Sequence, residues 1–309
     1  MIEPGVESER NQRVFRDKLV NAGHLIPSGV KGVYGHGGAF ETVVQHLDVY
    51  VTKVGADQKA ELIRFPPLLS RAAYERTDHL ETMPHLLGSI HSFAGAEPEY
   101  LELVRMHEAH EDWSRSLART DVVLAPAACY PLYPTASGTL PPGGRVVDLM
   151  ALAFRHEPSD DPTRMQMFRQ REYVRLGTPE QALTHRDEWL QRGEKLLESV
   201  GLDVTRVVAN DPFFGRGGRV MKATQREQEL KHELVVPITS QEKPTAVASC
   251  NYHLDHFGLA FAIRTADGGV AHSACIGFGY ERIVLALFNT HGMDPDLWPQ
   301  DVRRVLELS

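Results

Sequence analysis

Charged side chains gather around a polar turn near the middle of the chain. They are Arg155, Glu157, Arg164, Arg169, Arg171 and Glu172. Guanidinium groups in such a set can hold phosphate or carboxylate groups through paired hydrogen bonds. The solvated face of an ordinary hairpin would carry the same residue types, so this stretch alone leaves both interpretations open.

A second stretch has the composition of an anion-binding site. Gly277 and Gly279 would let the backbone come close to a ligand, and Arg282 lies in the first turn of a predicted apolar helix that continues over residues 283–288. Backbone N–H groups at a helix start, together with a guanidinium, suit a phosphate. A Gly-x-Gly-x-x-Arg pattern alone is weakly specific. Its combination with the first cluster makes the signal strong.

An antiparallel hairpin is expected to position the first cluster. The apolar residues 146–153 lead into Pro158 and a Ser-Asp-Asp-Pro turn, and residues 168–174 again alternate apolar with charged side chains. Further helices are predicted over residues 7–23, 39–51, 98–117 and 180–200, and further strands over residues 62–65, 122–125, 234–238, 245–249 and 257–263. The short connections favour a mostly antiparallel sheet flanked by helices, an α+β fold.

Composition narrows the class of protein. The 309 residues are 42% hydrophobic and 24% charged, as in ordinary globular proteins, and the formal net charge of −8 argues against tight binding to a phosphate backbone. Three cysteines without short spacing do not form a disulfide framework, which favours a reducing compartment. We see no secretory signal and no apolar run long enough for a membrane span, so a cytoplasmic protein is expected.

The two charged stretches resemble signature motifs of the class II aminoacyl-tRNA synthetases. Phe154-Arg-His-Glu157 with Arg164-Met-Gln-Met-Phe168 is similar to the second motif, and Gly277-Phe-Gly-Tyr-Glu-Arg282 to the third. Within the class, the chain resembles the atypical zinc-dependent seryl enzymes, and more closely their short homologues, the amino acid:[carrier protein] ligases. The resemblance runs from about Phe65 to the C-terminus. It includes Asn210-Asp-Pro-Phe-Phe214 and Ser249-Cys-Asn-Tyr-His-Leu-Asp-His-Phe-Gly258.

The resemblance implies a single class II catalytic domain over residues 1–309, with an N-terminal helical extension over about residues 1–60 and no separate tRNA-binding arm. The region of Pro66-Pro67 corresponds to the first motif, which forms the dimer interface in the family, so a homodimer is expected. Arg155 and Arg282 are the implied catalytic residues. The implied ATP-binding residues are Arg155, Glu157, Arg164, Met165, Phe168, Lys231, Ala246, Ser249 and Arg282.

In this scheme Arg155 holds the α-phosphate and Glu157 accepts a hydrogen bond from the adenine amino group. Phe168 and Arg282 cover the two faces of the adenine ring. Mg²⁺ is expected with ATP, because it neutralises the polyphosphate. Typical seryl enzymes place a magnesium-binding glutamate just before the Ser-Cys step, whereas this chain has Thr245-Ala246-Val247 there.

The resemblance also implies one zinc ion, bound by Cys129, Glu172 and Cys275, with the amino group of the substrate at the open position. Glu172 is therefore also the implied amino-acid-binding residue. The residues themselves leave other interpretations open, because the two cysteines could equally be small buried core residues. Two further candidate metal clusters are weaker: His107 with His110, and His253 with Asp255 and His256, where charged surface and pocket-edge residues are the simpler interpretations.

The short loop between Glu157 and Arg164 indicates which molecule accepts the activated amino acid. Only six residues, Pro158–Thr163, separate Glu157 from Arg164, and Asp160 and Asp161 lie among them, which disfavours contact with a tRNA acceptor stem. The homologues transfer a small amino acid, glycine or alanine, to the phosphopantetheine thiol of a small acidic carrier protein. The basic residues Arg216, Arg219, Lys222, Arg226 and Lys231 could form a docking surface for such a partner, or equally the solvated face of a helix. The alternatives are a seryl-type aminoacyl-tRNA synthetase that lacks its tRNA-binding domain and a non-catalytic paralogue.

Overall fold

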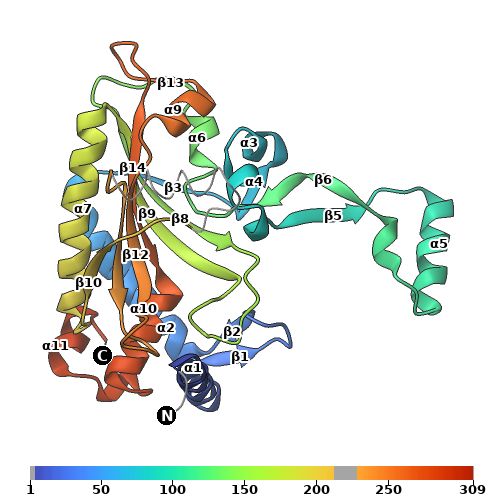
Figure 1. The fold of residues 1–309 in the computed structure, drawn as a ribbon, viewed down its shortest axis with the longest axis horizontal. Coiled ribbons are helices and arrows are strands. Elements are labelled where there is room, and N and C mark those ends of the chain that lie inside the picture. Colours follow the sequence, from blue (N-terminus) through green and yellow to red (C-terminus); the bar gives the residue numbers. More distant parts are fainter. Residues whose placement is uncertain (1–3, 212–227, 309) are drawn as a thin grey trace.

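A seven-stranded sheet forms the centre of the molecule (Figure 1). The computed structural model describes residues 4–211 and 228–308. The strands lie in the order β10 (Thr205–Val208), β11 (Lys231–Val236), β12 (Thr245–Tyr252), β14 (His272–Gly279), β9 (Met167–Gly177), β8 (Arg145–Phe154) and β3 (Glu61–Arg64). Neighbouring strands are antiparallel except β3 and β8, which are parallel. The predicted α+β fold and its central hairpin, β8–β9, are confirmed.

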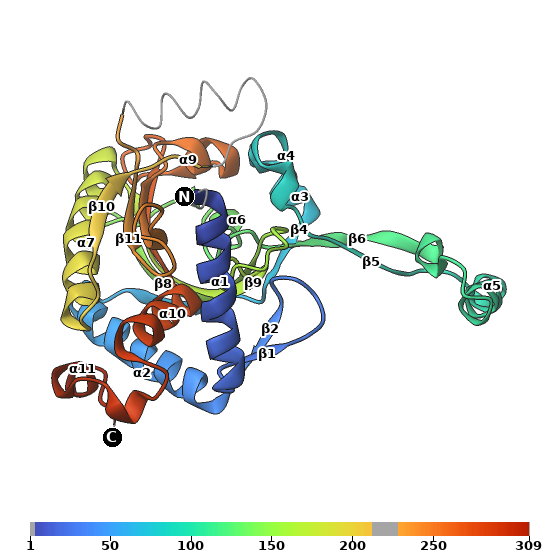
Figure 2. The same cartoon turned by 60° about the horizontal axis from the view of Figure 1, so that its bottom comes forward.

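Long helices cover one face of this sheet (Figure 2). Helix α7 (Pro179–Ser199) packs against β9, β12 and β14, and α10 (Tyr280–His291) packs against β9, β12 and α2 (Gly38–Gly55). Helices α1 (Pro4–Asn21) and α11 (Gln300–Val305) contribute Leu19 and Val302 to the same apolar core. The predicted amphipathic helices are therefore present, and their apolar stripes face the sheet.

Shorter elements cover the other face of the sheet. They include α3 (Arg71–Glu75), α4 (His79–Thr82), α6 (Leu132–Thr135) and α9 (His256–Phe261), which enclose a second core around Tyr133 and Phe257. The remaining short elements are β1 (Leu25–Pro27), β2 (Tyr34–His36), β7 (Gly138–Thr139), β13 (Ile263–Arg264) and the 3-10 turns η1 (Ala56–Gln58), η2 (Pro84–Leu86), η3 (Trp113–Ser116) and η4 (Pro295–Leu297). No helix within the described ranges combines the length and apolar character needed to cross a lipid bilayer.

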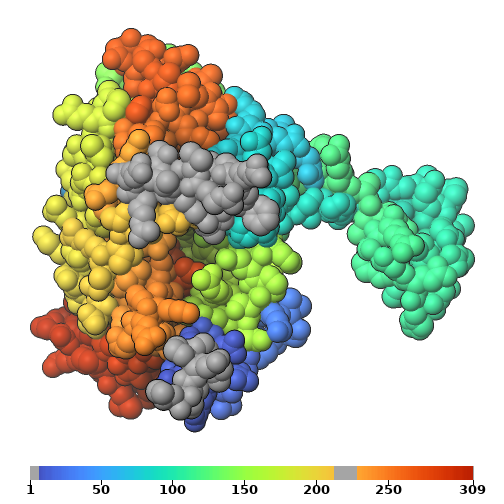
Figure 3. All heavy atoms as spheres, in the orientation of Figure 1, coloured from blue at the N-terminus to red at the C-terminus, as the bar shows by residue number. Residues whose placement is uncertain are grey.

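An arm projects from this body (Figures 1 and 3). It consists of strands β5 (Ser89–Phe93) and β6 (Leu117–Leu124), which form a three-stranded sheet with β4 (Leu68–Ser70), and it carries α5 (Glu97–Glu108) at its tip. The helix predicted over residues 98–117 is therefore wrong beyond Glu108. His110 adopts a left-handed backbone conformation, with φ of 57°, and the chain then turns into β6. A 12-residue helix that buries no side chain has no tertiary packing to extend it.

The predicted strand over residues 257–263 is also wrong, because α9 occupies most of it. Phe257 and Phe261, one helical turn apart, point into the core, while Leu259 between them is 62% exposed. A side chain at Gly258 would meet the carbonyl oxygen of Ala271, so the helix backbone lies directly against the chain that enters β14. A short apolar run carries no periodicity that separates a strand from a buried helix.

Alternation along β9 gives the strand two different faces. Arg169, Arg171 and Tyr173 point toward the long helices, as shown by the stacking of Tyr173 on Trp189 of α7 at a centroid distance of 4.3 Å. Phe168, Gln170 and Glu172 therefore point to the opposite face.

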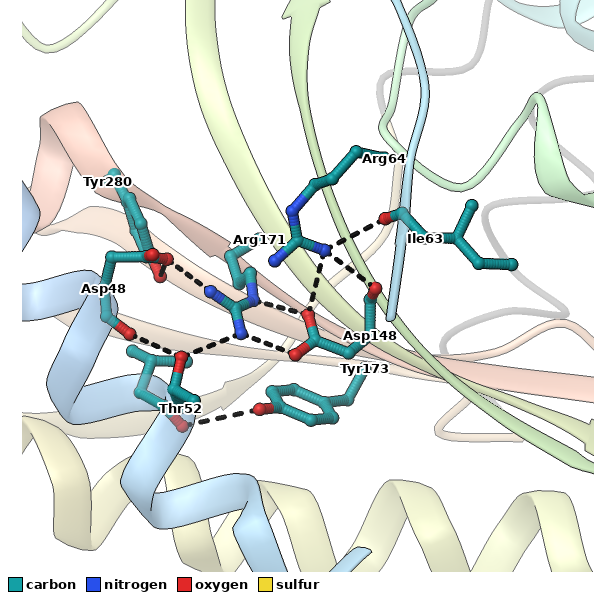
Figure 4. Close-up of polar contacts among 9 residues, drawn as sticks. Asp48, Thr52, Ile63, Arg64, Asp148, Arg171, Tyr173 and Tyr280 are labelled. Carbon is teal, nitrogen blue, oxygen red and sulfur yellow. Dashed lines mark hydrogen bonds and ion pairs between the residues drawn. The ribbon is translucent and has the colours of Figure 1, made fainter. Parts of the chain in front are cut away.

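Arg171 is the centre of a buried ionic network on the helix side (Figure 4). It is 1% exposed, and its Nε donates to Asp148 Oδ1 of β8 at 2.6 Å, while its Nη1 pairs with Asp48 of α2. Tyr280 of α10 donates to the same Asp48 oxygen at 2.8 Å. The network therefore joins α2 and α10 to the central hairpin.

We expect Arg171→Met to lower the free energy of unfolding by about 3–5 kcal/mol, because it leaves the carboxylates of Asp148 and Asp48 without their buried counter-charge. Urea denaturation measures the loss. Arg105→Met is the matched control, since Arg105 forms only exposed pairs on the arm, with Glu102 and Glu111. Equal losses in the two variants would contradict a central role for Arg171.

Candidate active site

A cavity of about 400 Å³ lies on the face of the sheet opposite α7 and α10. Its floor comes from Gln170 and Glu172 of β9, Ser249 and Asn251 of β12, and Cys275 of β14. These residues share one face because Cys275 pairs with Asn251, and Gly277 pairs with both Ser249 and Glu172, in the sheet register. Its walls include His79, Cys129, Tyr130, Arg155 and Phe257.

The structure brings the three predicted zinc ligands together. Cys129, Glu172 and Cys275 are 3%, 1% and 3% exposed and all line the cavity. The backbone N–H of Cys129 donates to Glu172 Oε1 at 3.2 Å, and the cysteines are free thiols. Glu172 Oε2 is buried without a hydrogen-bond partner, which is costly unless something else binds it.

The electrostatics of this group follow from its burial. Burial raises the pKa of Glu172, and a hydrogen bond with Cys275, together with burial, raises the pKa of the Cys129 thiol well above its usual value. Within residues 4–211 and 228–308, no three His, Cys, Asp or Glu side chains are arranged so that they already form a metal site.

Arg155 connects this group to the predicted nucleotide site. It lines the cavity, its Nε donates to the Pro126 carbonyl at 3.2 Å, and its guanidinium lies 5.4 Å from the ring centre of Phe168. Phe168 lies two residues before Gln170 and four before Glu172 on the same face of β9. One strand therefore carries the proposed adenine contact at one end and the carboxylate of the buried cluster at the other.

Arg282 approaches from the start of α10. Its Nε donates to the Thr163 carbonyl at 2.8 Å, and its Nη1 donates to the Ala246 carbonyl at 3.0 Å. Burial, together with the nearby charges of Arg155 and Arg164, lowers the pKa of Arg282 to about 10. The guanidinium is still charged at neutral pH, and an anion among these arginines would relieve their mutual repulsion.

The other predicted ATP-binding residues lie in different settings. Glu157 pairs with the half-exposed Arg164 at 3.3 Å, and Ser249 lines the cavity. Lys231 also lines the cavity and pairs with Asp211 at 2.5 Å; burial would lower its pKa, but Asp211 and Glu233 raise it overall. Met165 is 6% exposed and packs in the helix-side core, so its side chain is not among those that line the cavity.

Several cavity residues were not predicted. Gln170 accepts a hydrogen bond from the Ala128 N–H at 3.2 Å. Its position between Phe168 and Glu172 on the same face of the strand is the sequence signal that could have identified it. His253, which was predicted only as part of a weaker metal cluster, holds its Nδ1 at 3.0 Å from Ser273 Oγ and its Nε2 at 3.8 Å from Cys275 Sγ. His79, whose pKa burial lowers to about 4, has no comparable signal in the sequence.

The weaker metal candidates have separate outcomes. His107 and His110 are exposed on the arm and do not line the cavity. His253 and His256 both line it, and His256 pairs with Asp78 at 3.2 Å. Of the predicted docking residues, Arg216, Arg219, Lys222 and Arg226 lie outside the described residues, as do residues 212–214 of the Asn-Asp-Pro-Phe-Phe stretch.

Gly277 is required by close packing at the cavity floor. A Cβ at this position would lie 2.8 Å from Gln170 Nε2, so a side chain would displace the Gln170 amide, and it would be in van der Waals contact with Glu172 Cγ at 3.6 Å. This glycine therefore keeps the space over β9 open, as its place in the third motif predicts.

Comparison with known proteins decides the family. No established family model matches the chain. Two proteins of Bradyrhizobium diazoefficiens, named amino acid–[acyl-carrier-protein] ligase 1 and 2, are each 42% identical to it over 91% of this chain and over 86% and 84% of their own. The chain belongs to the amino acid–[acyl-carrier-protein] ligase family. A type-2 serine–tRNA ligase of Methanococcus aeolicus is 27% identical over 86% of this chain and 52% of its own.

Solved structures confirm the class II synthetase fold for this family member. The M. kandleri SerRS in complex with A. aeolicus tRNASec superposes with a TM-score of 0.80 at 22% identity, over 97% of this chain and 60% of its own. Seryl-tRNA synthetase from Pyrococcus horikoshii, complexed with ATP, gives a TM-score of 0.70 at 14% identity, over 96% of this chain and 63% of its own. The ligase thus spans about three fifths of these synthetases.

Proposed function

We propose that this ligase activates a small amino acid with ATP and transfers it to the phosphopantetheine thiol of a carrier protein. The observation that carries the proposal is that Phe168 and Glu172 lie on the same face of β9. The chain is also 42% identical to a protein named as a carrier-protein ligase. Phe168, next to Arg155, offers an adenine contact at one end of this face, and Glu172 offers an amine-binding group at the other.

In the first step, a carboxylate oxygen of the amino acid attacks the α-phosphorus of ATP, and the bond to pyrophosphate breaks. Arg155 stabilises the charge that develops on the α-phosphate oxygens. Phe168 and Arg282 hold the adenine ring between them, and Glu157 accepts from its amino group. Mg²⁺ accompanies the polyphosphate and neutralises its charge. The products are aminoacyl adenylate and pyrophosphate.

In the second step, the carrier thiol loses its proton and its sulfur attacks the carbonyl carbon of the adenylate. The carbon–oxygen bond to AMP then breaks, and a thioester forms. No protein nucleophile takes part, so the protein contributes positioning and charge stabilisation. Arg155 remains in contact with the phosphate that leaves.

We further propose that Cys129, Glu172 and Cys275 hold a zinc ion in this family member. The donor set suits zinc, the three side chains line one cavity, and Glu172 Oε2 is a buried oxygen without a partner. Zinc bound by three protein ligands supplies a Lewis-acid position for a neutral substrate amine. The side chains would have to turn toward a common point, because the described residues form no ready-made metal site.

The proposed substrate is glycine or alanine. We base this choice on the resemblance to the carrier-protein ligases, whose substrates are small amino acids. A pocket discriminates one methyl group by only about 1–3 kcal/mol, so we expect overlapping activity with both amino acids.

The short loop after Glu157 supports a carrier rather than tRNA as the acceptor. Asp160 pairs with Lys31 at 2.9 Å, and Asp161 accepts from Gln12 at 3.1 Å. The short loop is thus held against the N-terminal segment, which keeps it from extending toward a tRNA acceptor stem.

Pyrophosphate exchange with glycine, alanine and serine, followed by mass measurement of a holo-carrier protein, tests the acceptor. We expect exchange with the small amino acids and a mass gain on the holo-carrier, with none on a carrier that lacks phosphopantetheine. Arg155→Ala should reduce exchange by about 10²–10³-fold. Charging of tRNA without any gain on the carrier would falsify the acceptor and favour the seryl-type synthetase alternative.

Cys275→Ala is expected to lose zinc and amino-acid activation together, because it removes one of the three proposed ligands. Metal analysis of the purified variant, beside pyrophosphate exchange, measures both. Cys250→Ala is the control, since Cys250 is a buried core cysteine that does not line the cavity. A Cys275→Ala protein that keeps stoichiometric zinc, or a wild-type protein that binds none, would rule out the proposed metal site.

We also infer that the ligase forms a homodimer. Apolar side chains on the arm and at the sheet edge are left open to solvent, among them Leu62 at 67%, Leu101 at 58% and Tyr100 at 48% exposed. A partner would cover them. Light scattering of the purified protein should give twice the mass of 34.5 kDa. A monomer at micromolar concentration is the contrary result.

A further inference from the structure

The two side chains proposed to cover the faces of the adenine ring come from different elements. Phe168 belongs to β9, and Arg282 belongs to the first turn of α10. The distance between them therefore depends on how the strand and the helix are joined. The residues next to them, Arg169 and Glu281, make that junction.

A single carboxylate binds Arg169 twice. Glu281 Oε2 accepts from the backbone N–H of Arg169 at 2.7 Å, and Oε1 accepts from Arg169 Nε at 2.7 Å. The first bond holds the peptide unit that joins Phe168 to Arg169. Glu281 itself precedes Arg282, so one side chain links the backbone beside one adenine contact to the backbone beside the other.

The other edge of the Arg169 guanidinium is held by α2. Nη1 and Nη2 donate to the two carboxylate oxygens of Glu41 at 2.6 and 2.8 Å, and Nη2 lies 3.3 Å from His36 Nδ1. Because Glu281 and Glu41 bind both edges of the guanidinium, Arg169 is fixed relative to α2 and α10. Glu281 is 2% exposed, so loss of its contacts is not compensated by water.

We infer that Glu281 and Arg169 are positioning residues, which set the spacing of Phe168 and Arg282 and thereby the affinity for adenine. The Arg169 side chain points toward the long helices, and the Glu281 carboxylate is buried and bound to Arg169, so both act through their neighbours and not by contact with substrate. The inference rests on the nucleotide site of the proposed function. The competing explanation is a tie that stabilises the fold and has no effect on nucleotide binding.

Glu281→Gln separates the two explanations. Glutamine keeps one acceptor oxygen, but its amide NH₂ cannot accept from a second Arg169 donor. We expect about a tenfold rise in the KM for ATP and in the calorimetric Kd for ATP, because the weakened junction no longer holds Phe168 and Arg282 at one spacing. The turnover number and the KM for the amino acid should stay within about twofold, since interactions at the reacting atoms are intact.

Asp48→Asn is the matched control, because it removes a carboxylate from the neighbouring buried Arg171 on the same strand. It should lower the melting temperature and leave the KM for ATP unchanged. Glu281→Asp keeps the charge but shortens its reach, and should show the same rise in KM as Glu281→Gln. If both Glu281 variants melt lower and bind ATP normally, as Asp48→Asn does, the positioning role is wrong.

Two further variants distinguish a failure of this inference from a failure of the nucleotide site. Phe168→Ala and Arg282→Ala remove the proposed adenine contacts themselves and should weaken ATP binding more than Glu281→Gln. Normal ATP binding by both would refute the nucleotide site and with it the positioning role. Weakened binding in these two, beside normal binding in the Glu281 variants, would refute the positioning role alone.

Discussion

The buried charge of Arg171 fixes the strand on which the whole site is built. A guanidinium that is 1% exposed is tolerated only beside its counter-charges, and these come from Asp148 of β8 and Asp48 of α2 (Figure 4). A slip of β9 by one residue would move Arg171 into the cavity and Glu172 among the helices. The ionic network on the helix side therefore specifies which side chains face the substrate.

The opposite face of β9 is incompletely satisfied. On the helix side, Arg169 and Arg171 have carboxylate partners, whereas on the cavity side the buried Glu172 Oε2 has no hydrogen-bond partner. An unpaired carboxylate oxygen is costly to bury, so Glu172 marks a position on this face where a ligand would be stabilised. Alternate residues of β9 thus serve different ends: those on the helix side stabilise the fold, and those on the cavity side form the candidate site.

Local patterns in the sequence predicted much of this arrangement. The alternation after Phe168, the turn at Pro158 and the amphipathic run before Gly201 predicted the hairpin and α7, and the family motifs placed Arg155, Glu172 and Cys275, which prove to line one cavity. Periodicity failed where the run was short and apolar, as in α9. The contacts of Glu281 with Arg169, 112 residues apart in sequence, have no local signature, because only the tertiary fold brings two such charges together.

The length of β9 between Phe168 and Glu172 also constrains the substrate. Four residues of strand extend about 13 Å, at roughly 3.3 Å per residue, and in the proposed site this length would hold adenine, ribose phosphate and aminoacyl group in line. The neighbouring strand presents Gly277 opposite Glu172, and a side chain there would strike Gln170, midway along the path. In the proposed site, a larger residue at position 277 would therefore meet the adenylate between its phosphate and its amine. The third motif thus contributes an unobstructed surface as well as its arginine.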